Sequence, residues 1–189
     1  MKGPLFYSKI LLFGEYGIIE DSKGLSIPYN FFNGALKISE SSDEEAKKSN
    51  LILSQFSAFL KTLDIDLDLN SFDNHIKKGM YFDSSIPKGY GVGSSGALVA
   101  AVYEKYANNK ITVLENLTRE KLLVLKEIFS KMESFFHGKS SGLDPLNSYL
   151  SIPILIKSKN DIIVTGIPSQ KSNGSGAVFL LDSGQTGST

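Results

Sequence analysis

Apolar residues follow two kinds of pattern along this chain, and together they predict a mixture of strands and helices. An uninterrupted apolar run over residues 10–13, closed by Gly14, predicts a strand that is buried on both faces. The polar stretch over residues 39–50 predicts a loop. Apolar residues then recur at helical spacing over residues 51–63, which predicts an amphipathic helix.

The middle of the chain predicts two strands, a glycine-rich loop and a buried helix. Alternating apolar and polar residues favour strands around residues 67–72 and again around 80–82. A glycine-rich stretch at residues 87–96 follows. The next segment, residues 97–106, is rich in Ala, Val and Leu and contains no helix breaker. The order strand, glycine loop, helix is therefore expected here.

The second half predicts the longest helix and three more strands. Residues 118–136 place apolar side chains on one stripe, and Thr118 is suited to cap the helix. A loop at residues 137–144 and a short helix opened by Pro145 come next. Three strand-like runs cover residues 152–156, 162–164 and 177–181. The elements together indicate an α+β protein.

Composition limits the size and the partners of the protein. The chain has 189 residues, 41% of them hydrophobic, which is enough for one domain with a substantial core. Its 20 basic and 20 acidic residues cancel, so neither nucleic acid nor an anionic membrane is an expected partner. The absence of cysteine excludes disulfides, thiolate zinc sites and thiol nucleophiles. No signal peptide or membrane-spanning run is recognised, so a cytoplasmic location is expected.

The glycine-rich stretch has the composition of a phosphate-binding loop. Glycines allow the backbone to approach a ligand closely, and the start of a helix offers unpaired N–H groups and a positive dipole end. The residues expected to contact phosphate are Lys88, Gly89, Gly91, Gly93, Ser94 and Ser95.

Three other interpretations of the glycine motifs compete with phosphate binding. A tight turn with no ligand explains the loop equally simply. Residues 91–96 also fit the dinucleotide pattern G-x-G-x-x-G, with Glu115 at a suitable distance, although Pro87 and Lys88 separate the preceding strand from the loop. The stretch 138–140 (GKS) looks like the end of a Walker loop, but Glu133 occupies the position where the first glycine is required.

Two segments resemble motifs of the GHMP kinases. Residues 87–96 are similar to the second motif of that family, a proline followed by a glycine-rich loop ending in Gly-Ser-Ser-Ala; here Gly96 replaces the alanine, a change expected to leave phosphate contact unaffected. Residues 7–19 resemble the first motif, in which a basic residue begins a strand that ends in Gly-Glu-His. Lys9 and Glu15 match, whereas Tyr16 replaces the histidine.

A third segment resembles the mevalonate kinases within that family. Residues 133–144 contain an acid, then His-Gly, then Ser-Gly-x-Asp, at matching separations. The resemblance implies that Glu133 binds Mg²⁺ and that Asp144 is the catalytic base. Judged on the residues alone, Glu133 borders the apolar stripe of its helix and is expected to reach solvent, and Asp144 before Pro145 is a good N-cap. His137 is interpreted as a positioning or structural residue.

The resemblance implies a fold and an activity. The fold would be α+β and ribosomal protein S5 domain 2-like, with a mixed sheet packed against helices. Residues 1–181 would form the N-terminal ATP-binding domain and residues 182–189 the start of a missing C-terminal domain. The reaction would be ATP- and Mg²⁺-dependent phosphorylation of mevalonate to 5-phosphomevalonate, a step of isoprenoid precursor synthesis, with these residues alone weakly active or inactive.

The implied roles divide among a few residues. Lys9 and Asp144 would be catalytic, and Ser95 and Glu133 would hold Mg²⁺. The acceptor pocket would be lined by Glu15, Tyr16, His137 and Ser141. Phosphomevalonate kinase, another metabolite kinase of this family and a non-catalytic ligand-binding module are the alternatives. A small-molecule hydroxyl substrate is the expected partner, and a homodimer is an open option.

Overall fold

The computed structural model describes residues 4–14, 23–38, 43–112, 117–158, 160–166 and 184. Its helices are α1 Glu44–Leu60, α2 Leu69–Lys77, α3 Ser94–Tyr106, α4 Arg119–His137 and α5 Leu143–Leu150. Its strands are β1 Phe6–Phe13, β2 Gly24–Ile38, β3 Met80–Ser84, β4 Ile154–Ser158 and β5 Asp161–Val164. The predicted strand at 177–181 and the proposed domain boundary at 181 lie outside the described residues.

The described strands form one sheet organised around β2. The order is β1-β2-β4-β5, with β3 also paired to β2. The start of β2 pairs with β4 and its end pairs with β3, while its other edge follows β1. Every described pairing is antiparallel, so the expected mixed sheet is antiparallel in this part of the chain. A dinucleotide loop requires a parallel βαβ unit, and the described pairings do not provide one.

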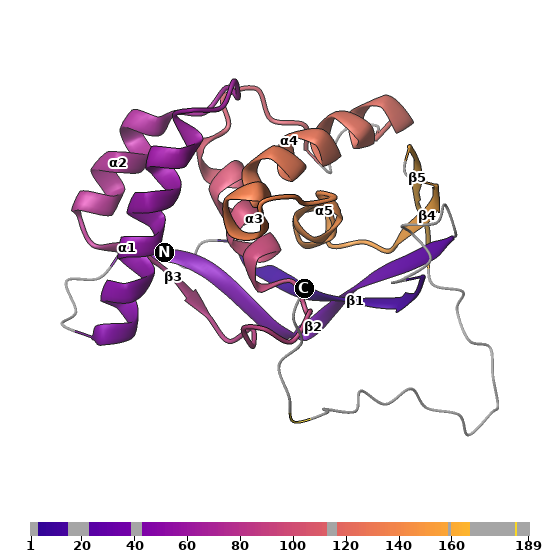
Figure 1. Ribbon diagram of the computed structural model, residues 1–189, viewed down its shortest axis with the longest axis horizontal. Coiled ribbons are helices and arrows are strands. Elements are labelled where there is room, and N and C mark those ends of the chain that lie inside the picture. Colours follow the sequence, from indigo (N-terminus) through magenta and orange to yellow (C-terminus); the bar gives the residue numbers. More distant parts are fainter. Residues whose placement is uncertain are drawn as a thin grey trace.

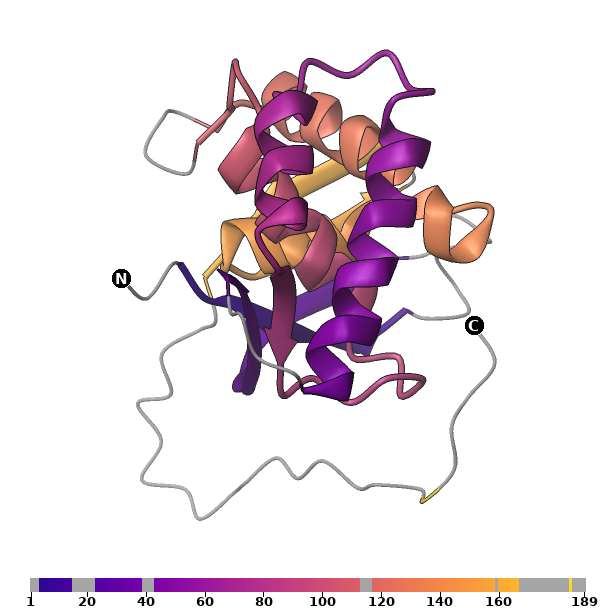
Figure 2. The ribbon, with the colours of Figure 1, turned by 90° about the vertical axis from the view of Figure 1, so that its left-hand side faces the viewer.

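The helices lie together on one face of this sheet, which gives a two-layer α+β arrangement (Figure 1). The view at right angles shows the same two layers (Figure 2). This explains why the expectation that residues 10–13 are buried on both faces is wrong. Described helices cover only one face of the sheet, and Phe13 remains 51% exposed.

Helix α3 forms the centre of the core. Val99, Ala100 and Val102 are completely buried, and α3 packs against α4, α5 and the sheet. A helix that is apolar all round is expected to be buried in this way. The loop before α3 is therefore attached to a deeply buried helix.

Two predicted elements differ in the structure because side-chain caps start helices where a loop and a strand were expected. The polar stretch was expected to be a loop, yet α1 begins at Glu44, where Asp43 accepts a hydrogen bond from the Glu45 N–H at 3.2 Å. The segment expected to be a strand around 67–72 is α2, opened by Asp68, which accepts from the Ser71 N–H at 2.9 Å. Capping by aspartate favours helix in both places.

The buried stripe of α4 confirms the helix predicted over residues 118–136. Thr118 caps it, accepting from the Lys121 N–H at 3.4 Å. Leu125 is completely buried, whereas its neighbour Val124 is 49% exposed.

We therefore expect Leu125→Ala to lower the free energy of unfolding by about 2–5 kcal/mol, because it leaves a cavity in the core. Val124→Ala is the matched control and should change that free energy by less than about 0.5 kcal/mol. Urea denaturation of both variants measures the difference. Equal losses in the two variants would show that α4 does not pack as described.

Candidate active site

The glycine loop adopts a backbone that suits glycine alone. Gly89, Gly91 and Gly93 have φ angles of 79°, 67° and 83°, in the left-handed region. Gly93 occupies the N-cap position of α3 and supplies no side-chain cap. No side chain therefore caps the first N–H groups of α3. An anion at this position would meet both these donors and the positive end of the helix dipole.

Lys9 joins β1 to this loop. Its backbone N–H donates to the Val92 carbonyl at 3.0 Å, and a Cβ added to Gly93 would lie 3.0 Å from Lys9 Cγ. The Lys9 Nζ lies 2.9 Å from Asp144 Oδ1. Lys9 is only 8% exposed. It therefore differs from most lysines at strand edges, which keep the ammonium group in water.

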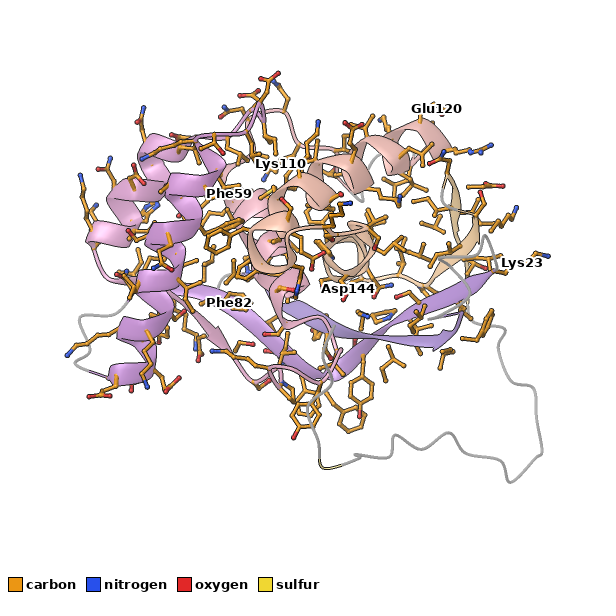
Figure 3. All side chains as sticks on the ribbon, viewed as in Figure 1. Lys23, Phe59, Phe82, Lys110, Glu120 and Asp144 are labelled. Atoms are coloured by element: carbon orange, nitrogen blue, oxygen red, sulfur yellow. The ribbon has the colours of Figure 1, made fainter. Side chains whose placement is uncertain are left out.

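Asp144 does not cap its helix, which corrects the capping interpretation. Helix α5 begins at Leu143, and its N-cap is Gly142 with φ 72° and no side-chain cap. Asp144 therefore lies in the first turn, where its carboxylate pairs with Lys9. Its position between the helices and the sheet is labelled in Figure 3.

Glu133 is the buried acid of the site. It is only 3% exposed, and its Oε1 accepts a hydrogen bond from the Ser95 hydroxyl at 3.0 Å. Its Oε2 accepts a hydrogen bond from the Ser140 hydroxyl. The His137 Nε2 also lies 3.0 Å from Ser95 Oγ, so α3, the end of α4 and the following loop meet here. The interpretation that Glu133 reaches solvent at the edge of its helix is therefore wrong.

Burial raises the pKa of Glu133 to about 7, and the nearby Asp144 charge adds to this effect. Hydrogen bonds from Ser140 and Ser95 and the charge of Lys9 act in the opposite direction. Near neutral pH this carboxyl is thus distributed between its protonated and ionised forms.

This raised pKa predicts a specific pH dependence of stability. Between about pH 4.5 and 7 the folded Glu133 keeps a proton that the unfolded chain has released, so the free energy of unfolding falls as pH rises and levels off above pH 7. The fall attributable to Glu133 is on the order of 3 kcal/mol. In Glu133→Gln this contribution should disappear. Urea denaturation across pH 4–8 measures it, with the exposed Glu127→Gln on the same helix as control.

One result of the pH series would contradict this prediction. If Glu133→Gln and the parent lost the same free energy of unfolding between pH 4.5 and 7, Glu133 would not be protonated in the folded protein.

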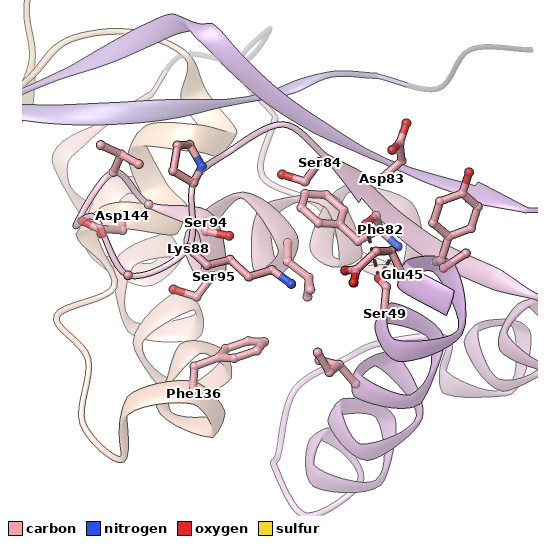
Figure 4. A pocket seen from close by; sticks show the side chains of 18 of the residues that line it. Glu45, Ser49, Phe82, Asp83, Ser84, Lys88, Ser94, Ser95, Phe136 and Asp144 are labelled. Atoms are coloured by element: carbon pink, nitrogen blue, oxygen red, sulfur yellow. Dashed lines mark hydrogen bonds between the residues drawn. The ribbon is translucent and has the colours of Figure 1, made fainter. Parts of the chain in front are cut away.

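A cavity of about 490 Å³ opens beside the loop and continues to α1 and β3. Its described lining combines the glycine loop and the start of α3 with Asp43, Glu45, Ala46, Ser49, Ile52, Tyr81, Phe82, Asp83, Ser84, Pro87, Leu98, Phe136, His137 and Asp144. Figure 4 shows Lys88 reaching into this space, with Asp144 toward one end and Glu45 and Ser49 toward the other. Charged side chains therefore lie at both ends of the cavity.

The structure brings most of the predicted residues together, but not all of them. The acceptor-pocket candidates Glu15 and Tyr16 lie outside the described residues. The Ser141 hydroxyl accepts from the Leu143 N–H at 3.3 Å, and Ser141 is not among the described residues that line the cavity. Ser140 was not predicted as a site residue. It and Ser141 are adjacent serines, and only the direction in which the loop points each side chain distinguishes them.

The oxygen atoms at Ser95 and Glu133 suit a hard cation. Mg²⁺ prefers oxygen ligands and usually keeps several waters while binding one or two protein groups and phosphate oxygens. Within the described ranges, no group of three or more His, Cys, Asp or Glu side chains could enclose a metal without such help. A hard cation held by these two oxygens would need water or phosphate oxygens to complete its ligands.

Comparison with known proteins identifies a family. The model of the GHMP kinases N terminal domain matches residues 50–151, just over half of the chain. No curated protein matches the sequence. None of the helices in the described ranges has the length and apolar character needed to cross a bilayer.

A solved mevalonate kinase structure shares the fold. The Methanococcus jannaschii mevalonate kinase matches with a TM-score of 0.51 at 16% identity, over 87% of this chain and 56% of that one. A second mevalonate kinase structure matches with a TM-score of 0.49 at 18% identity, over 88% and 56%. This chain thus spans a little more than half the length of these proteins. On the family match and this shared α+β fold, the chain belongs to the GHMP kinases and carries their N-terminal domain.

Proposed function

We propose that this protein transfers a phosphoryl group from ATP to a hydroxyl of a small molecule, with Mg²⁺ as cofactor and mevalonate as the acceptor. The observation that carries the proposal is the meeting of two pairs at the start of α3. Lys9 and Asp144 form one pair, and Ser95 with the buried Glu133 forms the other. Phosphoryl transfer depends mainly on such positioning and on neutralised charge.

The phosphate end of the site would be formed by the loop and α3. Lys88 and the N–H groups that follow the left-handed glycines offer positive charge and donors to the phosphates. Ser95 and Glu133 would hold Mg²⁺, which supplies charge neutralisation on the phosphate oxygens. His137 would orient the Ser95 hydroxyl from the other side.

The acceptor end would be formed by Lys9 and Asp144. Asp144 would accept the proton of the acceptor hydroxyl as that oxygen bonds to the terminal phosphorus and ADP leaves. Lys9, at 2.9 Å, holds the Asp144 carboxylate in place and brings a positive charge next to the oxygen on which negative charge develops.

A panel of acceptors with coupled detection of ADP tests the activity. Supplied with Mg²⁺ and ATP, the intact protein is expected to release ADP with mevalonate in excess of the acceptor-free rate. A higher rate with phosphomevalonate or a sugar hydroxyl would move the assignment to another GHMP kinase. Normal ATP binding without ADP release for any acceptor would instead indicate a ligand-binding module.

A further inference from the structure

Gly96, the third residue of α3, lies against the start of α5 with no side chain between them. A Cβ added to Gly96 would lie 2.7 Å from the Asp144 carbonyl carbon, 2.7 Å from the Pro145 nitrogen and 2.9 Å from Asp144 Cβ. Two of these neighbours are backbone atoms, which cannot rotate out of the way. Even the smallest side chain at position 96 would therefore require α5 to move.

The other side of α5 restricts such a movement to a small one. Gly142, at the N-cap of α5, lies against α4, and a Cβ there would be 2.1 Å from the Lys126 carbonyl oxygen and 2.7 Å from the Ser130 nitrogen. The Gly142 N–H also donates to Ser140 Oγ at 3.0 Å. The first turn of α5 is therefore held between two helices, by one glycine on each side.

This close approach connects the two halves of the proposed site. Gly96 follows Ser95, whose hydroxyl bonds to Glu133, and it touches Asp144, whose carboxylate pairs with Lys9. We propose that Gly96 is a positioning residue: its bare Cα sets the separation between the phosphate-binding end of the site and the Asp144 carboxylate. The expectation that glycine in place of the family's alanine leaves phosphate contact unaffected is kept, and the proposed effect of Gly96 is on Asp144.

The inference rests on the proposed function and predicts a separation of kinetic effects. Gly96→Ala should displace Asp144 away from α3 and lower kcat by about 10- to 100-fold, because misplacement of a reacting group by a fraction of an ångström to 1 Å has effects of this size. The KM for ATP should stay unchanged, since Lys88, the loop glycines and the N–H groups of Ser94 and Ser95 precede Gly96. Gly166→Ala is the matched control, because a Cβ there meets nothing within 4 Å.

A second variant separates positioning from general damage. Glutamate at position 144 has a longer side chain that can reach back toward α3. The double variant Gly96→Ala with Asp144→Glu should therefore lose less activity than the product of the two single losses. If Gly96→Ala only damaged the fold, the losses would multiply.

The experiment measures kcat, the KM for ATP and the stoichiometry of ATP binding for these variants of the intact protein. The inference is supported if kcat falls while the ATP-binding stoichiometry and the KM for ATP stay unchanged. The double variant must also lose less activity than the product of the two single losses. Three results for Gly96→Ala would overturn the inference. They are a parental kcat, a loss of kcat matched by an equal loss of ATP-binding stoichiometry, and failure of the variant to fold. If the parent protein itself did not turn over, the proposed function would fail first, which keeps the two failures distinct.

Discussion

Replacing Asp144 with asparagine is expected to lower kcat by about 10² to 10⁴-fold, the range over which a positioned general base contributes to catalysis. The amide keeps the shape of the side chain but cannot take the proton of the acceptor hydroxyl. Lys9 would still lie beside it, so the fold of the site and the KM for ATP should change little. Steady-state ADP release by the intact protein at saturating ATP and acceptor measures the loss.

A surface pair provides the control for this substitution. Asp73 pairs with Lys61 at 2.6 Å on the outside of α1 and α2. Asp73→Asn makes the same chemical change away from the cavity and should leave kcat unchanged. Retention of near-parental kcat in Asp144→Asn would remove Asp144 from the role of base.

Lys9→Met is expected to lower kcat by about 10² to 10³-fold, the range found when one preorganised donor to a developing negative charge is removed. Methionine keeps an unbranched stem against Gly93 and removes only the ammonium group. Asp144 then also loses the partner that holds its carboxylate. The same ADP-release assay measures the effect, with Lys61→Met as the control from the surface pair.

The double variant of Lys9 and Asp144 tests whether the two residues act as one unit. Groups that act together lose little more when both are removed than when one is removed. We therefore expect the double variant to be about as slow as the slower single variant. Losses that multiply would show that the two side chains contribute independently and that the 2.9 Å contact has no role in the reaction.

The parts of the fold that the sequence predicts well are those with strong local patterns. The stripe of α4 and the apolar run of α3 specify buried helices without reference to the rest of the chain. Strand β2 was missed, because Pro28, Asn30 and Gly34 interrupt its pattern and its pairing with β1, β3 and β4 supplies the order that local sequence lacks.

The candidate site was predictable to a similar extent: its motif residues could be recognised in the sequence, whereas the contacts that depend on tertiary packing could not. Motif spacing selected Lys9, Glu133 and Asp144, which the fold then brings together. It could not indicate that Ser140 rather than Ser141 contacts Glu133, since the difference is one of loop direction. It also could not reveal the tight contact of Gly96 with α5, because the distance between two helices is decided by packing.

We propose that the start of α3, with Ser95 and Glu133, binds ATP together with Mg²⁺. Calorimetric titration of this chain with ATP, in Mg²⁺ and in EDTA, tests this binding directly. We expect one binding site whose affinity is weaker by about tenfold or more in EDTA, since the cation then no longer neutralises the charge of the phosphates. Glu133→Gln should bind ATP in Mg²⁺ only as weakly as the parent does in EDTA. Equal affinity in Mg²⁺ and EDTA, or no binding of ATP at millimolar concentration, would show that the site does not bind ATP with Mg²⁺.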